Sequence, residues 1–346
     1  MDNDLNHVRI VASMTKPTAV IDKSLLEPIC SFPDQTSSHC LRFLRENFTI
    51  YAPEILIEEV VTNYYDPNPE PRKTVAAKML RAISDFHLME HPLELVYREV
   101  VLGMDVRTGF DLNADATGNW RDWLSNLDSC LPQGKEFVKI RYAEKTDEVD
   151  KMKTFQENLR LTDPRNPDSP NPTCFEEFVQ KTEIFLRMIF ADPKRKQAFE
   201  KHLGASLNKW HPETVQRTEE ALAKLSIDDL SRKTFTHDYT MVFLLYLWAP
   251  VARIGPQKSK PSNPIVLPGK KVNNEADAEY IVCALHCDYL LTCDKGMHKM
   301  AELHNLTCRF KHIGRNQRQA VLIDRPPDFP TDDQVDNLLN RLGSLL

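Results

Sequence analysis

The chain is poor in glycine. Of its 346 residues only 10 are glycine, against 23 proline, whereas average proteins contain more glycine than proline. No two glycines have the spacing G-x-G-x-x-G or G-x-x-x-x-G-K, in which backbone N–H groups cradle the phosphates of a bound nucleotide. The sequence therefore excludes both a dinucleotide-binding fingerprint and a P-loop.

Long apolar runs are also missing. The most apolar run is Met241–Val251 (MVFLLYLWAPV), which is too short to span a bilayer and predicts a buried helix. The first residues, MDNDLNHVRI, carry early acids and no apolar stretch behind a basic region, unlike a secretory signal. We therefore expect a cytoplasmic protein that does not insert into a membrane.

Paired cysteines and an excess of basic charge are absent too. The eight cysteines form no C-x-x-C pair, which disfavours a zinc ribbon and is typical of reduced, packed thiols inside the cell.

The net charge of −6 argues against a protein that coats nucleic acid with its whole surface. A local basic groove is still compatible with this charge.

The N-terminal part alternates strands and helices, a pattern typical of a parallel sheet with helices on its faces. The expected order is strand Thr18–Ile21, a helix that starts at Leu25 with Ser24 as its N-cap, helix Ser38–Glu46, strand Phe48–Ala52 and helix Glu54–Asn63.

The same alternation returns near the C-terminus. The expected order there is helix Glu275–Cys287, strand Tyr289–Thr292, helix Lys295–His304, strand Leu306–Phe310 and a last amphipathic helix over about 332–345.

Between these parts, from about 72 to about 250, helical periodicity recurs and strand-like alternation is almost absent; Val75–Phe86 is the first of these expected helices. The sequence thus predicts an α/β fold: a three-layer α/β/α domain with a central parallel sheet, formed by residues 1–90 and 236–346. A large all-helical insertion, residues 91–235, interrupts it, which is tolerated when the ends of an insertion lie close together.

Four carboxylates occupy comparable places in this predicted architecture. Asp22 and Asp294 come just past the ends of two predicted parallel strands, and ligand sites of open α/β sheets lie at that edge. Glu59 shares the inward face of its helix with the apolar residues one turn earlier. Asp277 heads an apolar helical stripe, which places it at the N-terminal, core-facing end of its helix.

Four like charges at one end of a sheet repel one another unless a cation joins them. Ligation by carboxylate oxygens alone suits Mg²⁺ or Mn²⁺. Such an ion lowers the pKa of bound water and stabilises the charge that develops in phosphodiester displacement. The four acids therefore indicate metal-dependent phosphodiester hydrolysis.

The segment NNEADAEYIVCALHCDYLLTCDKGM, residues 273–297, resembles the block that carries the third and fourth acids of the PIN-domain nucleases, with Asp277 and Asp294 in those places and Thr292 as a neighbour. AVIDKSLL is similar to the family's first-acid strand, with Asp22 and the hydroxyl of Ser24, and YAPEILIEEV is similar to its second-acid helix, with Glu59.

This resemblance covers roughly residues 15–66 and 272–325. It implies a three-layer PIN-like fold and a Mg²⁺- or Mn²⁺-dependent nuclease activity, most often on RNA, in which Asp22, Glu59, Asp277 and Asp294 are the catalytic and metal-binding residues. The chain departs from compact members of the family because the whole helical region separates its second and third acids. The resemblance therefore assigns no role to the insertion.

Each acid also has a structural interpretation. Asp22 and Asp294 could cap helices, Asp277 could complement a helix dipole, and Glu59 could lie on a solvated helix face. Ser24 and Thr292 could orient ligands or serve as ordinary cap and strand hydroxyls. The family order of all four acids favours a metal site over these separate readings.

Basic residues gather beside the last two acids in sequence. Those that could contact phosphates are Lys270, Lys271, Arg309, Lys311 and Arg315, and a solvated loop explains them equally well.

The sequence thus supports the hypothesis of a PIN-like endonuclease whose partner is nucleic acid, with RNA as the expected substrate. The helical insertion would shape substrate access or bind a partner protein. One alternative is a catalytically inactive PIN-like scaffold that binds protein or RNA through the insertion, and another is a structure-specific DNA nuclease.

Overall fold

The structure is a computed structural model of the chain. It describes residues 16–65, 70–89, 92–104, 274–285, 287–298, 319–327 and 329–346, together with residue 301 and shorter stretches between 124 and 242.

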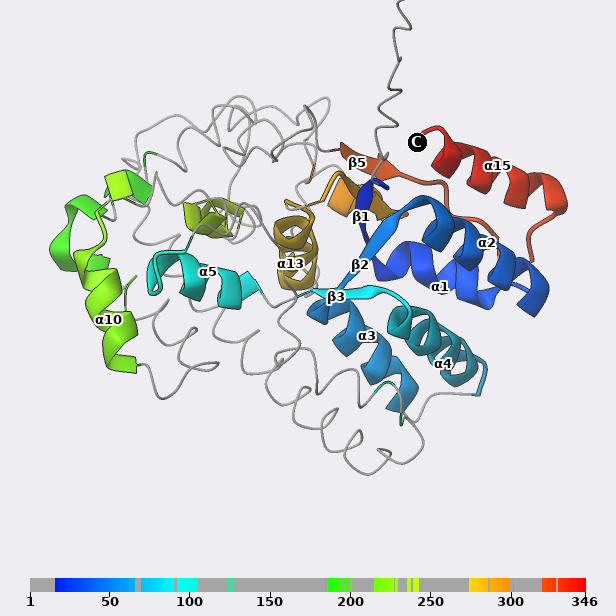
Figure 1. Cartoon of the computed structure of the whole chain (residues 1–346), viewed down its shortest axis with the longest axis horizontal. Coiled ribbons are helices and arrows are strands. Elements are labelled where there is room, and N and C mark those ends of the chain that lie inside the picture. The colour runs from blue at the N-terminus through cyan, green and yellow to red at the C-terminus, as the bar shows by residue number, and fades with distance from the viewer. Residues whose placement is uncertain are drawn as a thin grey trace, which may run out of the picture.

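A parallel sheet forms the centre of the described structure (Figure 1). Its five strands lie in the order β3-β2-β1-β4-β5, and each adjacent pair is parallel. The strands are β1 (Thr18–Ile21), β2 (Thr49–Pro53), β3 (His87–Met89), β4 (Tyr289–Thr292) and β5 (Gln319–Leu322). This confirms the prediction of an α/β fold with a parallel sheet.

The central strand β1 joins the two distant parts of the chain. Val20 pairs with Tyr51 of β2 on one side and with Leu290 of β4 on the other. At the amino end of the β1–β4 pair, the backbone N–H and the hydroxyl of Thr18 donate to Asp288 Oδ2 at 2.8 and 2.9 Å. These contacts fix the register of β4 against β1, so the residues that follow the two strands lie next to each other.

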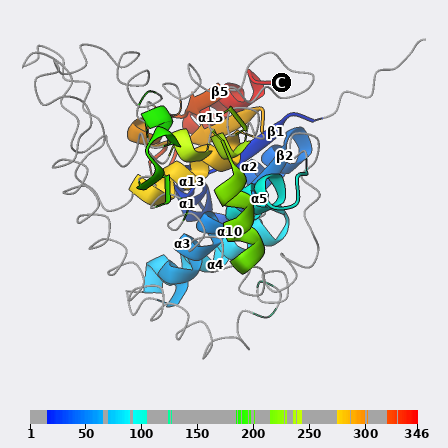
Figure 2. The same ribbon diagram turned by 90° about the vertical axis from the view of Figure 1, so that its left-hand side faces the viewer.

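Helices cover both sides of the sheet. In Figure 1, α1 (Lys23–Ser31), α2 (Asp34–Asn47), α4 (Glu70–Ser84) and α15 (Asp332–Gly343) lie on one side, and α13 (Asn274–Ala284) lies on the other. Figure 2 shows α13 together with α5 (Pro92–Val100) and α10 (Val215–Lys224) on the side that faces the viewer.

Helix α3 (Glu54–Tyr65) follows β2 directly and contacts α1, α4 and α13. It therefore starts at the carboxyl edge of the sheet, where β2 ends, and lies beside α13.

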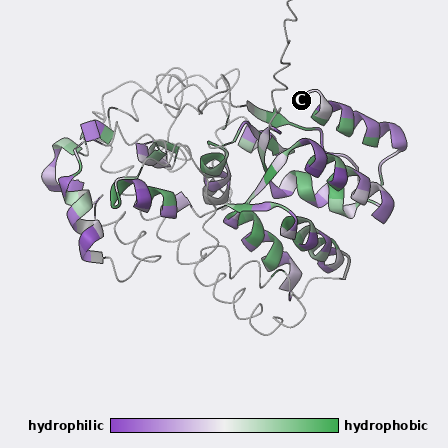
Figure 3. Ribbon diagram, viewed as in Figure 1, coloured by the Kyte–Doolittle hydropathy of each residue, from purple (hydrophilic) through white to green (hydrophobic). Residues whose placement is uncertain are grey.

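The central strand of the sheet is buried on both faces. Ala19, Val20 and Ile21 of β1 are completely buried, as expected for a central parallel strand with an unbroken apolar sequence. On α15, Val335, Leu338 and Leu342 are buried at helical spacing. Figure 3 shows the resulting division of this helix into a hydrophobic and a hydrophilic side.

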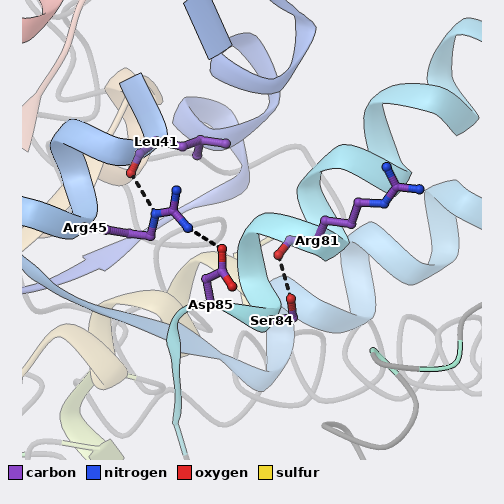
Figure 4. Close-up of polar contacts among 5 residues, drawn as sticks. All are labelled: Leu41, Arg45, Arg81, Ser84 and Asp85. Atoms are coloured by element: carbon purple, nitrogen blue, oxygen red, sulfur yellow. Dashed lines mark hydrogen bonds and ion pairs between the residues drawn. The ribbon is translucent and has the colours of Figure 1, made fainter. Parts of the chain in front are cut away.

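An ion pair joins α2 to the turn that leads from α4 into the edge strand β3 (Figure 4). Arg45, near the end of α2, pairs with Asp85, which precedes β3, and its Nε donates to the Leu41 carbonyl at 3.3 Å. Ser84 Oγ donates to the Arg81 carbonyl at 2.7 Å and closes the last turn of α4. The turn into β3 thus contacts α2, while β3 itself is held in the sheet by its pairing with β2.

The expected strands Thr18–Ile21 and Tyr289–Thr292 are confirmed residue for residue. The expected helix over 75–86 is wrong at its end, because α4 stops at Ser84 and the strand β3 follows. A strand of 3 residues is too short to show alternation. Strand β5 was also missed, and the segment 306–310, where the last strand was expected, lies outside the described residues.

Four of the five described cysteines, Cys30, Cys40, Cys283 and Cys287, are buried, as expected for packed thiols. Among the described helices, none combines the length and the apolar character that crossing a bilayer requires.

Replacing a core leucine tests this packing. Leu26→Ala removes a completely buried side chain from α1, and we expect the free energy of unfolding to fall by about 2–5 kcal/mol, since a cavity replaces well-packed atoms. The control is Arg45→Ala, whose partly exposed ion pair stabilises by no more than about 1 kcal/mol. Urea denaturation measures both, and equal losses in the two variants would contradict the assignment of α1 to the core.

Candidate metal centre

Asp22 lies directly after β1 and is the N-cap of α1. Its Oδ1 accepts a hydrogen bond from the backbone N–H of Leu25 at 3.1 Å, and its backbone is extended, as an N-cap requires. The expectation that Ser24 caps this helix is therefore wrong. The helix starts at Lys23, earlier than expected, so Asp22 stands at the N-cap position and Ser24 lies inside the first turn.

Two hydroxyls hold the Asp22 carboxylate. Ser24 Oγ lies 2.9 Å from Oδ1 and 2.8 Å from Oδ2, and Thr292 Oγ1 donates to Oδ2 at 2.9 Å. The same hydroxyls accept from the next turn of chain, since the N–H of Cys293 donates to Ser24 Oγ and that of Asp294 to Thr292 Oγ1, both at 2.8 Å. The carboxyl ends of β1 and β4 are thus joined through one buried network.

Asp294 lies at the carboxyl end of β4 beside this network. Its Oδ1 accepts from the N–H groups of Gly296 and Met297 at 2.6 and 3.0 Å, so it also caps a helical turn. Within the described residues, Oδ2 has no hydrogen-bond donor, and the residue is exposed. One oxygen of Asp294 is therefore fixed by the turn that follows it.

Glu59 is half-buried on α3, and its Oε2 accepts a hydrogen bond of 2.9 Å from the hydroxyl of Tyr280 on α13. Burial and the charges of Glu59 and Asp22 raise the pKa of Tyr280 well above its ordinary value, partly offset by the backbone amide of Lys23. Tyr280 is therefore a neutral donor at physiological pH. Tyr280 was not predicted as a site residue from the sequence, although its place one turn after Asp277 was the available signal.

Asp277 is the carboxyl group whose pKa is raised by burial and by the charges of all three other acids. Burial raises its pKa to about 7, and the charges of Asp294, Glu59 and Asp22 add to the rise. The pKa of Asp22 is also raised to about 7, because burial and, to a lesser degree, the charge of Glu59 outweigh its hydrogen bonds to Ser24, Thr292 and Leu25. The four carboxylates therefore form one electrostatic cluster at the carboxyl edge.

These side chains do not meet at a single point. In the part of the chain that the structure describes, no three His, Cys, Asp or Glu side chains are arranged to hold one metal ion between them. Mg²⁺, however, usually keeps several waters and is bound through one or two carboxylates, with substrate phosphates completing its shell. The chemistry of this donor set, four carboxylates of which Asp277 is influenced by the other three, fits an ion held in that way.

The basic residues predicted to contact phosphates, Lys270, Lys271, Arg309, Lys311 and Arg315, lie outside the described residues. Other cations lie near the cluster. Lys23 and Lys295 follow Asp22 and Asp294 along the chain, and the charge of Arg325 acts on Cys293, between Thr292 and Asp294.

Comparisons with known proteins yield no relative: no protein-family model, no curated protein and no solved structure matches the chain.

The buried charge of Asp22 predicts an unusual dependence of stability on pH. Its folded-state pKa of about 7 lies above the ordinary value of 3.8, so between these values the folded chain binds more protons than the unfolded chain. Stability of the metal-free protein therefore falls as the pH rises from about 4 to about 7. At pH 8 in a chelator, Asp22→Asn should raise the free energy of unfolding by on the order of 1–4 kcal/mol, because the neutral amide avoids the buried charge.

The matched control is Asp34→Asn. Asp34 is exposed, and its ion pair with Lys78 lowers the pKa of its carboxyl, so neutralising it should not stabilise the protein at pH 8. Thermal unfolding at pH 5 and pH 8 measures both variants. Equal or lower stability of Asp22→Asn than of the parent chain at pH 8 would contradict the assignment of a costly buried charge to Asp22.

Proposed function

We propose that the chain is a metal-dependent endonuclease of the PIN-like type that hydrolyses phosphodiester bonds in RNA, with Mg²⁺ or Mn²⁺ as its cofactor. The observation that carries this proposal is the coupling of Asp277 to the three other acids, which come from three separate elements of the sheet's carboxyl edge. Such an arrangement is destabilising without a cation, so its presence at the usual ligand edge of a parallel sheet favours a function over a structural role.

The architecture supports the proposal. A parallel sheet with helices on both sides agrees with a three-layer PIN-like domain formed by residues 1–90 and 236–346. In this interpretation residues 91–235 form the helical insertion, in which α5 contacts both α10 and α13. Since α13 carries Asp277, the insertion has a direct structural connection to the cluster and would shape access to it or bind a partner protein.

The ion would supply an activated water and neutralise the charge that develops on the reacting phosphate. Asp22 and Asp294 would hold it from the ends of β1 and β4, with Ser24 and Thr292 fixing the orientation of the Asp22 carboxylate through their hydrogen bonds. Glu59 and Asp277 would hold it, directly or through its waters, from α3 and α13. Lys23 and Lys295 would contact the flanking phosphates of the substrate.

Removing one acid tests the mechanism. With single-stranded RNA and Mn²⁺, Asp294→Asn should lower the cleavage rate at least about 100-fold, the loss typical when a group that stabilises transition-state charge is removed. Because Asn keeps an oxygen that can cap the following turn, the fold should be preserved. The assay is the initial rate of cleavage of an end-labelled RNA, with a chelator as the metal-free reference.

The control is Glu58→Gln, which neutralises the neighbour of Glu59 on α3 and should leave the rate unchanged. Cleavage by Asp294→Asn at the parental rate would overturn the mechanism. Parallel reactions with single-stranded DNA and a flapped duplex distinguish RNA from DNA, and cleavage of DNA alone would overturn the RNA assignment.

A second candidate is a PIN-like scaffold without activity. It is favoured by the finding that no three ligating side chains in the described residues are arranged around one ion.

Thermal unfolding with added Mn²⁺ separates the two functions. A metal site stabilises the folded state through mass action, so we expect the melting temperature to rise in the parent chain and to stay constant in Asp22→Asn. An unchanged melting temperature of the parent chain would support the scaffold.

A further inference from the structure

Tyr280 occupies a position that connects the elements carrying the acids. It lies on α13, one helical turn after Asp277, and its side chain is 2% exposed. Its hydroxyl donates to Glu59 Oε2 on α3 at 2.9 Å. The hydroxyl oxygen of Tyr280 also interacts with the backbone amide of Lys23, the residue after Asp22. One buried hydroxyl thus lies next to the elements that supply three of the four acids.

The energetics of this contact favour a fixed geometry. A hydrogen bond to a charged acceptor is stronger than one between neutral groups, and a buried hydroxyl without a partner is costly. The aromatic ring is held by the surrounding core, whereas the Glu59 side chain has three rotatable bonds. Tyr280 therefore restricts Glu59, rather than the reverse.

We propose that Tyr280 is a positioning residue of the metal centre, whose hydroxyl fixes the Glu59 carboxylate toward the cluster and so maintains its affinity for the divalent cation. The inference rests on the proposed function. It goes beyond it by assigning a role to a residue that ligates nothing itself. Groups that hydrogen-bond to metal-ligating side chains typically contribute 10–100-fold to metal affinity.

The alternative is that the hydroxyl only fastens α13 to α3. Tyr289 provides a matched control, because its hydroxyl donates to the Leu345 carbonyl at 2.8 Å and therefore makes a similar hydrogen bond in a different place. Its removal as Tyr289→Phe is expected to affect stability without affecting the metal.

The experiment is titration of the full chain with Mn²⁺, followed by electron paramagnetic resonance of the free ion. Tyr280→Phe should raise the Kd for Mn²⁺ about 10-fold or more. The Kd of Tyr289→Phe should equal that of the parent chain. If Tyr280 acts through Glu59, the double variant Tyr280→Phe/Glu59→Gln should bind Mn²⁺ no more weakly than Glu59→Gln alone, whereas independent effects would multiply.

Equal Kd values for the parent chain and Tyr280→Phe, or multiplying effects in the double variant, overturn the inference and leave the proposed function intact. A parent chain that binds no Mn²⁺ overturns the proposed function and the inference with it. If Tyr280→Phe does not fold, Glu59→Asp tests the same contact, because the shorter side chain withdraws its carboxylate from the hydroxyl; unchanged affinity in that variant also overturns the inference.

Discussion

The buried carboxylate of Asp22 is the constraint on which the arrangement of this molecule depends. It caps α1 through Leu25, and it accepts hydrogen bonds from hydroxyls on α1 and β4. These donors favour the ionised form, yet burial still raises the pKa of Asp22 to about 7. A carboxyl group needed only as a helix cap could lie at the surface, where capping carries no desolvation cost. The cost is explained if the group holds a cation.

The sheet order places this group where the other acids can reach it. Strand β1 is central, with β2 on one side and β4 on the other. Asp22 follows β1, whereas the helix with Glu59 follows β2 and Asp294 follows β4. Helix α13 contacts both β1 and β4 and brings Asp277 to the same edge. Four acids that are far apart in sequence therefore influence one another electrostatically, because parallel strands bring their carboxyl ends to one side.

Much of this arrangement could be predicted from sequence. Apolar runs such as Thr18–Ile21 define buried parallel strands, and the acids that follow them must then lie at the carboxyl edge. The hydroxyl of Thr292 was recognised as a neighbour of the acids, and the structure places it against Asp22. Local pattern and strand order suffice for such residues.

Other features depend on contacts that no local pattern records. Strand β3 has 3 residues and is held by its parallel pairing with β2, which lies far from it in the sequence. The cap is Asp22 and not Ser24, because α1 already begins at Lys23. Tyr280 was missed because a tyrosine in an apolar helical stripe is typical of a core, and only the packing of α13 against α3 brings its hydroxyl to Glu59.

The central claim is that the carboxyl edge between β1 and β4 binds a divalent cation. Anomalous diffraction from crystals of the chain grown or soaked with Mn²⁺ tests it most directly. The account predicts an anomalous peak next to the carboxylates of Asp22 and Asp294, which is absent when either residue is replaced by Asn. A well-ordered carboxyl edge without a peak at saturating Mn²⁺ would contradict it.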